Sequence, residues 1–70
     1  MKNVLCLYLR SGHSLFVTQP DGSDDAWAEQ IVERWKTING GFLECDLLFE
    51  QHGVKKIIMW PKDVIAIGIG

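Results

Sequence analysis

The stretch DDAWAEQIVERWKTI, residues 24–38, decides the fold because it carries the clearest helical periodicity in the sequence. Its large apolar side chains recur three or four positions apart, at Trp27, Ile31, Trp35 and Ile38. Ser23 or Asp24 is suited to cap the first turn, and the glycines of residues 39–41 are suited to end the last one. We therefore expect one amphipathic helix, whose tryptophan-bearing side packs on a sheet.

Two short strands are predicted before this helix. VLCLYL, residues 4–9, alternates leucines with Val4, Cys6 and Tyr8, and SLFVT, residues 14–18, alternates in the same way. Ser11-Gly12 lies between the two runs, and glycine supplies the positive φ that a tight turn requires. An antiparallel hairpin is the expected arrangement.

Three further strands are predicted after the helix. They span residues 42–49, 54–60 and 64–69, with a His52-Gly53 turn and a PKD corner at residues 61–63 between them. In the first of these strands one face holds Leu43, Cys45, Leu47 and Phe49. The order β-β-α-β-β-β predicts an α+β fold with an antiparallel sheet or small open barrel, in one domain over residues 1–70.

Composition limits the functions that fit this chain. Of 70 residues, 47% are hydrophobic and 23% charged, which is typical of a folded domain. The net charge of −2 argues against a partner bound by bulk electrostatics, such as a nucleic acid or an anionic membrane. No apolar run approaches the roughly 20 residues of a membrane span, and the N-terminal segment lacks the pattern of a signal peptide. Cys6 and Cys45 are too few for a disulfide framework, so we expect a cytoplasmic protein with free thiols.

The last strand is apolar on both faces, which one helix cannot cover. Alternation puts three isoleucines on one face and Val64, Ala66, Gly68 and Gly70 on the other. A domain of this size buries only about 60% of its unfolded surface, so small size and surplus apolar surface favour self-association as a dimer or larger oligomer. The residues predicted to form that interface are Tyr8, Ile65, Ala66, Ile67, Gly68 and Ile69. Alternatively, the small residues pack beneath Trp27 or Trp35 within one chain, or the sheet curls into a barrel.

No pattern predicts catalysis or a cofactor. His13 and His52 lie in predicted turns, and no HxxxH, HxH or CxxC spacing provides a metal site. The sequence places no base beside Ser11, Ser14 or Ser23 that could activate a serine nucleophile. The glycine-rich segment is not followed by the lysine that a phosphate-binding loop requires. We expect a non-enzymatic protein without metal or cofactor. The residues predicted to contact a ligand or nucleic acid are Arg10, His13, Lys55, Lys56, Trp60 and Lys62.

The segment MWPKDVIAIGI, residues 59–69, resembles the end of Sm-like and SH3-like small barrels, where a short corner joins the last two strands. In bacterial Sm-like RNA chaperones the segment reads aromatic-Lys-His-small-Ile, and Asp63 here replaces the histidine that contacts RNA. The whole chain resembles short uncharacterised proteins of phages and mobile elements, through its LRSG turn and its apolar-Pro ending. That resemblance implies a host protein or a small signalling ligand as partner.

These observations favour a self-associating binding protein. The alternative is a nucleic-acid-binding module of Sm-like or OB-like type, which would stack bases on exposed aromatic rings beside basic residues.

Overall fold

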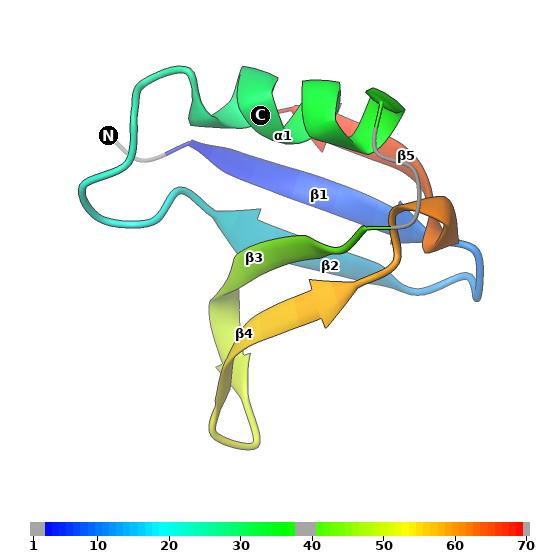
Figure 1. The fold of residues 1–70 in the computed structure, drawn as a ribbon. Helices are drawn as coiled ribbons and strands as arrows, with labels where there is room; N and C mark the ends of the chain where they lie inside the picture. Colours follow the sequence, from blue (N-terminus) through cyan, green and yellow to red (C-terminus); the bar gives the residue numbers. More distant parts are fainter. Residues whose placement is uncertain (1–2, 38–40, 70) are drawn as a thin grey trace.

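The computed structural model describes residues 3–37 and 41–69, and it confirms the α+β fold and the predicted order of elements (Figure 1). The elements are β1 (Val4–Leu9), β2 (Ser14–Thr18), α1 (Trp27–Thr37), β3 (Leu43–Gln51), β4 (Val54–Met59), a short 3₁₀ turn η1 (Pro61–Asp63) and β5 (Val64–Ile69). The helix begins later than predicted, and residues 38–40, where its end was expected, lie outside the described residues.

The strands form one open antiparallel sheet in the order β4-β3-β2-β1-β5. β1 and β2 are joined by residues 10–13, where the Leu9 amide donates to the His13 carbonyl oxygen at 2.8 Å and Gly12 has φ +95°. This confirms the predicted hairpin and the role of its glycine. Because β5 returns to pair with β1, the free edges of the sheet belong to β4 and β5.

The core lies between the helix and the concave side of the sheet. Its fully enclosed members come mainly from alternating positions of three strands: Leu5, Leu7, Val17 and Leu43. Trp27 and Ile31 of α1 complete it, and Trp35 donates from Nε1 to the Val64 carbonyl oxygen at 3.0 Å. The predicted apolar side of the helix therefore faces the sheet, and an indole hydrogen bond ties α1 to the start of β5.

The connection between β2 and α1 is organised by Gln19, whose side chain is largely buried. Its Oε1 accepts from the Asn3 amide at 3.2 Å, and its Nε2 donates to the Asp24 carbonyl oxygen at 3.1 Å. The Asp24 carboxylate accepts from the Ala26 amide at 2.8 Å, so Asp24 caps the turn that leads into α1 at Trp27. One amide side chain thus joins the beginning of β1 to the entrance of the helix.

A β-bulge in β5 changes which residues share a face. Tyr8 lies opposite Ala66, but the next residue of β1, Leu9, lies opposite Val64, so Ile65 is the extra residue. The prediction that Val64 shares a face with Ala66 and Gly68 is wrong, because the bulge turns Val64 into the core, where it is 4% exposed. Ile65 is left 58% exposed.

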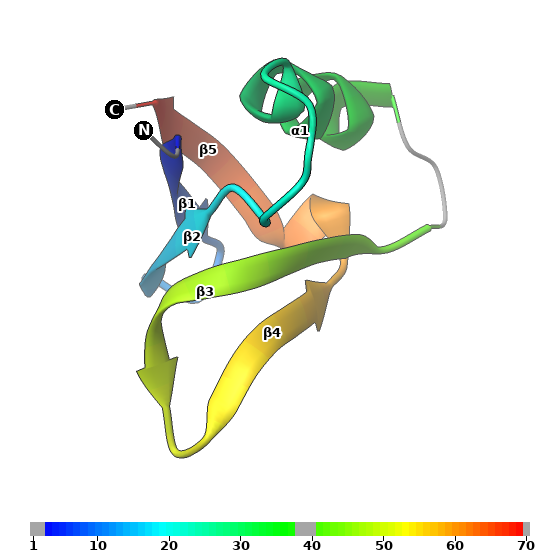
Figure 2. The same ribbon diagram turned by 90° about the vertical axis from the view of Figure 1, so that its left-hand side faces the viewer.

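β3 bends strongly, so that the β3–β4 pair turns away from the plane of the other strands (Figure 2). Its pairing with β4 is regular up to Asp46, opposite Lys56, and resumes at Gln51, opposite Val54, after a shift. The extra residues of β3 break its alternation, and Phe49 leaves the core face on which it was predicted and is 63% exposed. His52 and Gly53, both with positive φ, form the predicted tight turn.

Candidate interaction surface

The convex face of the sheet carries apolar side chains that the helix does not cover. On its β1–β5 part, Tyr8 lies opposite Ala66 and Cys6 lies opposite Gly68. A Cβ added at Gly68 would lie 3.5 Å from Cε2 of Tyr8, so the tyrosine ring lies against the glycine backbone. The small residues therefore contact β1 side chains on the face away from α1. They do not pack beneath the tryptophans.

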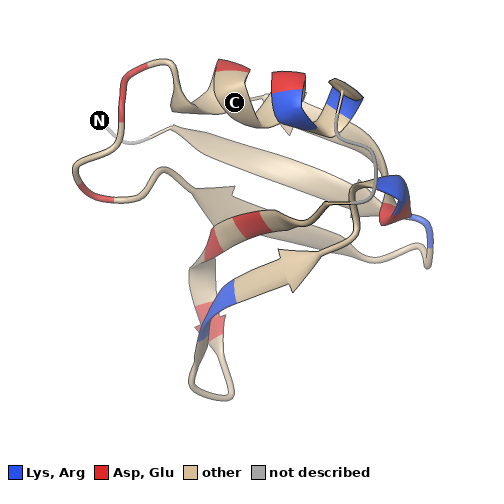
Figure 3. Ribbon diagram, viewed as in Figure 1, with Lys and Arg blue, Asp and Glu red and all other residues tan. Residues whose placement is uncertain are grey.

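The free edge of β5 adjoins this face and carries two of the most exposed isoleucines. Ile65 is 58% exposed and Ile69 is 70% exposed, whereas Ile67 is half-buried and packs against the core. β5 contains no charged residue and no proline, and its ribbon is free of charge in Figure 3. Edge strands of soluble proteins are usually protected by charge, proline or a covering segment, so this edge is suited to pairing. We call Tyr8, Ile65, Ala66, Gly68 and Ile69 the β5 surface.

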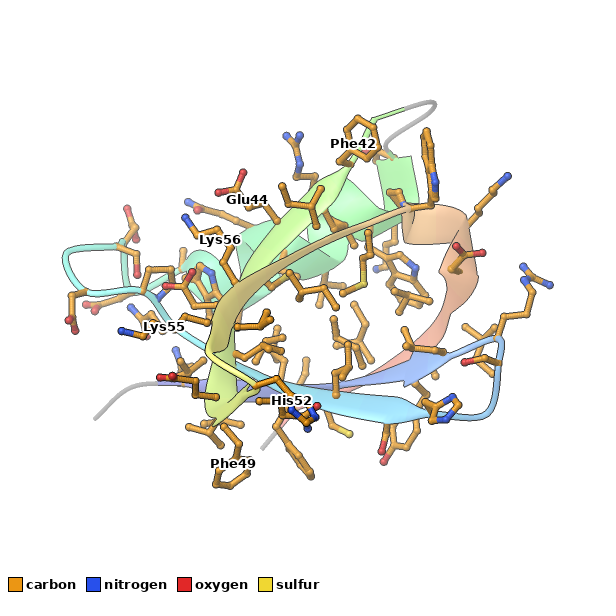
Figure 4. The ribbon with its side chains drawn as sticks, turned by 90° about the horizontal axis from the view of Figure 1, so that it is seen from below. Phe42, Glu44, Phe49, His52, Lys55 and Lys56 are labelled. Carbon is orange, nitrogen blue, oxygen red and sulfur yellow. The ribbon has the colours of Figure 1, made fainter. Side chains whose placement is uncertain are left out.

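The opposite free edge, on β4, is protected by charge. Lys55 and Lys56 lie on this strand, and the Lys56 Nζ is 3.0 Å from Oε1 of Glu44 on β3 (Figure 4). This pairing raises the pKa of Lys56, first through the hydrogen bond to Glu44 and then through the negative charges of Glu44 and Asp46. Lysine on an edge strand disfavours pairing with another strand. The two edges of the sheet thus differ in their capacity to accept a second chain.

An aromatic contact extends the convex face toward β3. The rings of Phe16 and Phe49 meet edge to face, with centroids 6.2 Å apart. Figure 4 shows Phe49 pointing away from the interior of the bent sheet. Sequence reasoning missed this pair, because the contact requires the bend in β3. Between Asp46 and the turn, β3 contains more residues than the part of β4 that faces it. This difference is seen only when the two strands are paired.

Three of the predicted contact residues, Arg10, Trp60 and Lys62, gather around η1. Arg10 Nη2 donates to the Lys62 carbonyl oxygen at 2.8 Å, and Lys62 Nζ lies 5.9 Å from the ring centroid of Trp60. Trp60 in turn packs on Phe42, with centroids 4.5 Å apart. His13 lies in the β1–β2 connection, with Nδ1 3.0 Å from the Ser11 hydroxyl. Lys55 and Lys56 are not part of this cluster, since they lie on β4.

A pocket of about 450 Å³ opens beside this cluster, between the β1–β2 turn and β4. Ile57, Met59 and Leu9 give it apolar walls, and Arg10, Ser11 and Asp63 line it with polar groups. Pockets of this size and lining accept small organic molecules in other proteins.

Reactive groups are sparse among residues 3–37 and 41–69. No group of three or more His, Cys, Asp or Glu side chains in these ranges is placed to hold a metal ion. Both cysteines are free thiols, and burial, aided by the charges of Asp46 and Glu44, raises the pKa of Cys45 to about 11. The pKa of Tyr8 is raised first by its hydrogen bond to the Cys6 side chain and then by the electrostatic effect of that Cys6 side chain. A raised pKa keeps the Cys45 thiol protonated and unreactive at neutral pH.

No helix within the described ranges has both the length and the apolar character needed to cross a membrane. Comparison of the chain with protein-family models, with curated proteins and with solved structures found no match.

Proposed function

We propose that this protein is a non-enzymatic binding protein that works as a homo-oligomer, assembled through the β5 surface. The observation that carries the proposal is an edge strand without charge or proline, whose two outer isoleucines are 58% and 70% exposed. Apolar edges of this kind add a strand from another chain in many complexes. The small size of the domain adds to the advantage of association.

The energy available from this edge favours a modest affinity. Full burial of an isoleucine side chain contributes about 1.5–3 kcal/mol, so covering the remaining exposed parts of Ile65 and Ile69 contributes about 1–2 kcal/mol each. Two copies supply about 4–8 kcal/mol, which is comparable to the roughly 4–15 kcal/mol cost of association. A micromolar dimer needs about 8 kcal/mol of net binding energy. Backbone hydrogen bonds of the added strand and contacts of Tyr8 would therefore have to supply most of it, and the proposal requires that they do.

Sedimentation velocity across the micromolar range tests this proposal. The variant Ile69→Lys places a charge at the exposed edge and is expected to shift the wild-type oligomer to a monomer. Ile58→Lys is the matched control, because Ile58 is 60% exposed on β4 and its substitution leaves the β5 surface intact. A wild-type chain that sediments as a monomer at all of these concentrations contradicts the proposal.

Besides a second copy of this chain, we propose that the protein binds a host protein or a small ligand, as the resemblance to phage proteins implies. The pocket beside Arg10 is the place where we propose a small apolar ligand with a polar end would bind. We also propose a cytoplasmic location, because both cysteines are free thiols.

The alternative, a nucleic-acid-binding module, is favoured by one feature. Trp60 is 46% exposed, Lys62 lies beside its ring, and Arg10 is bonded to the Lys62 backbone, so a base could stack on the ring while a phosphate meets the cations. The ion pair of Lys56 with Glu44 removes one of the cations on which this alternative depended. Binding to single-stranded RNA at low salt that is lost in Trp60→Ala would support the alternative, and absence of binding would end it.

A further inference from the structure

The second copy fits the edge of β5 in one particular way. We infer that two copies pair β5 against β5 in an antiparallel, two-fold manner, with the axis at Ile67, to make one continuous ten-stranded sheet. This inference rests on the proposed function, since it specifies how the self-association through the β5 surface is built.

The first argument is the self-complementarity of the strand. Residues 65–69 read Ile-Ala-Ile-Gly-Ile, so large and small side chains are symmetric about the central Ile67. In an antiparallel pair centred there, Ala66 lies opposite Gly68 of the second copy, and Ile67 lies opposite the Ile67 of that copy. An interface with two-fold symmetry requires a surface that complements itself, and residues 66–68 meet that requirement.

The second argument is the regularity of the segment that would pair. Residues 66–69 form an unshifted ladder with β1, from Ala66 opposite Tyr8 to Ile69 opposite Leu5. The bulge is confined to Ile65, at the beginning of this segment, where the exposed side chain is not held in the core. A regular stretch of edge therefore extends from Ala66 through Ile67 to Ile69.

The third argument is the difference between the two edges. If β4 of one copy met β5 of the next, an uncharged strand would lie against Lys55 and Lys56, and the contact would extend into a ring or filament. Pairing β5 with itself leaves the lysines in water and closes after two copies. Charge thus favours a symmetric dimer over an open chain.

Pairwise cross-linking tests the register. In a Cys6→Ser background, the variants Ala66→Cys and Gly68→Cys are prepared separately, oxidised alone and as a mixture, and separated on a non-reducing gel. Removing Cys6 prevents a disulfide within the chain, because Cys6 is the β1 partner of Gly68. A Cβ at Gly68 makes only ordinary contacts, 3.5 Å from Tyr8 and 3.7 Å from Cys6, so the fold is expected to tolerate the change.

The geometry predicts a selective result. Opposite residues of antiparallel strands have Cα atoms about 4.5–5.5 Å apart, which is within the range of a disulfide. Like positions, 66 with 66 or 68 with 68, would be two residues out of register and about 8–9 Å apart, which is too far. The mixture is expected to give a covalent dimer at least tenfold more abundant than either variant alone. If Gly68→Cys fails to give the wild-type circular dichroism spectrum, Ile67→Cys alone reports the same register, because Ile67 lies opposite the Ile67 of the second copy when the axis is at this residue.

The outcomes separate the two proposals. A dimer in sedimentation that cross-links selectively in the mixture supports the inference. A dimer that does not cross-link, or that cross-links equally in the unmixed samples, overturns the two-fold β5 pairing and leaves self-association standing. A monomer in sedimentation overturns both.

Discussion

Gln19 offers the sharpest test of how this small domain is held together. Substitution of Gln19 by Met keeps the size of the side chain but removes the acceptor for the Asn3 amide and the donor to the Asp24 carbonyl oxygen. The backbone bond from the Gln19 amide to the Asn3 carbonyl oxygen, 2.9 Å, is unaffected. The change therefore removes two side-chain hydrogen bonds and little else.

The expected cost follows from what each lost bond leaves behind. The Asp24 carbonyl oxygen keeps a partner, because it also accepts from the Trp27 amide at 3.0 Å, and the Asn3 amide is near enough to the surface for water to reach it. Two net hydrogen bonds at about 0.5–1.5 kcal/mol each, with little penalty for an unpaired group, destabilise by about 1–3 kcal/mol. At about 4–8 °C per kcal/mol for a domain of this size, Tm is expected to fall by about 4–24 °C.

Gln19→Glu is the matched variant, because its protonated side chain restores both bonds. At neutral pH the carboxylate still accepts from Asn3 but repels the Asp24 carbonyl oxygen, whereas the neutral acid donates to it. The folded state thus raises the pKa of this Glu above its unfolded value of about 4.3, so its stabilising contribution is present below that pH and is lost as pH rises. Urea denaturation at pH 7 and pH 3.5, each against the wild type, measures the difference. A Met variant as stable as the wild type, or a Glu variant whose deficit does not shrink in acid, would refute this account.

Three further predictions concern burial, titration and backbone strain. Leu7→Ala, at a fully buried site, is expected to cost about 2–5 kcal/mol in urea denaturation, and Ile58→Ala, at a 60% exposed site, less than about 1 kcal/mol; equal costs would contradict the assigned core. Because Cys45 stays protonated in the folded state up to about pH 11, stability is expected to fall by about 1–2 kcal/mol between pH 9 and 11, a loss that Cys45→Val should lack when the two proteins are titrated in parallel. Gly53→Ala, at φ +79°, is expected to lower the free energy of unfolding by about 1 kcal/mol, and an unchanged urea midpoint would argue against the assigned turn.

Much of the fold could be predicted from alternation and turn residues. β1, β2 and β5 have the predicted bounds, because period-two patterns and glycine turns are local properties of the sequence. The helix was predicted from its apolar spacing, although its first predicted residues form the capping turn instead. Local sequence could not predict Gln19 as a buried connector, because its partners are distant in the chain or belong to the backbone.

The candidate surface was predicted less completely, because bulges depend on pairing partners. Tyr8, Ala66 and Gly68 lie together as alternation indicated, but Val64 was assigned to the wrong face. The wrong face was assigned because β5 has an extra residue, Ile65, next to the pair of Leu9 and Val64. The sequence of β5 alone does not show that this residue is extra. The same reason explains why Phe49 was placed in the core and its contact with Phe16 was missed.

The pairing of β5 with β1 also has a consequence for how the chain folds. The β1–β2 and β3–β4 hairpins join neighbours and form within microseconds, whereas the pairing of Leu5 with Ile69 must bring together positions separated by nearly the whole chain. Until that step is complete, β1 exposes an unpaired edge that fits the β5 strand of any copy. Refolding at high concentration is therefore expected to divert molecules into strand-exchanged dimers, in which each chain completes the sheet of the other. Dilute refolding favours the intramolecular partner.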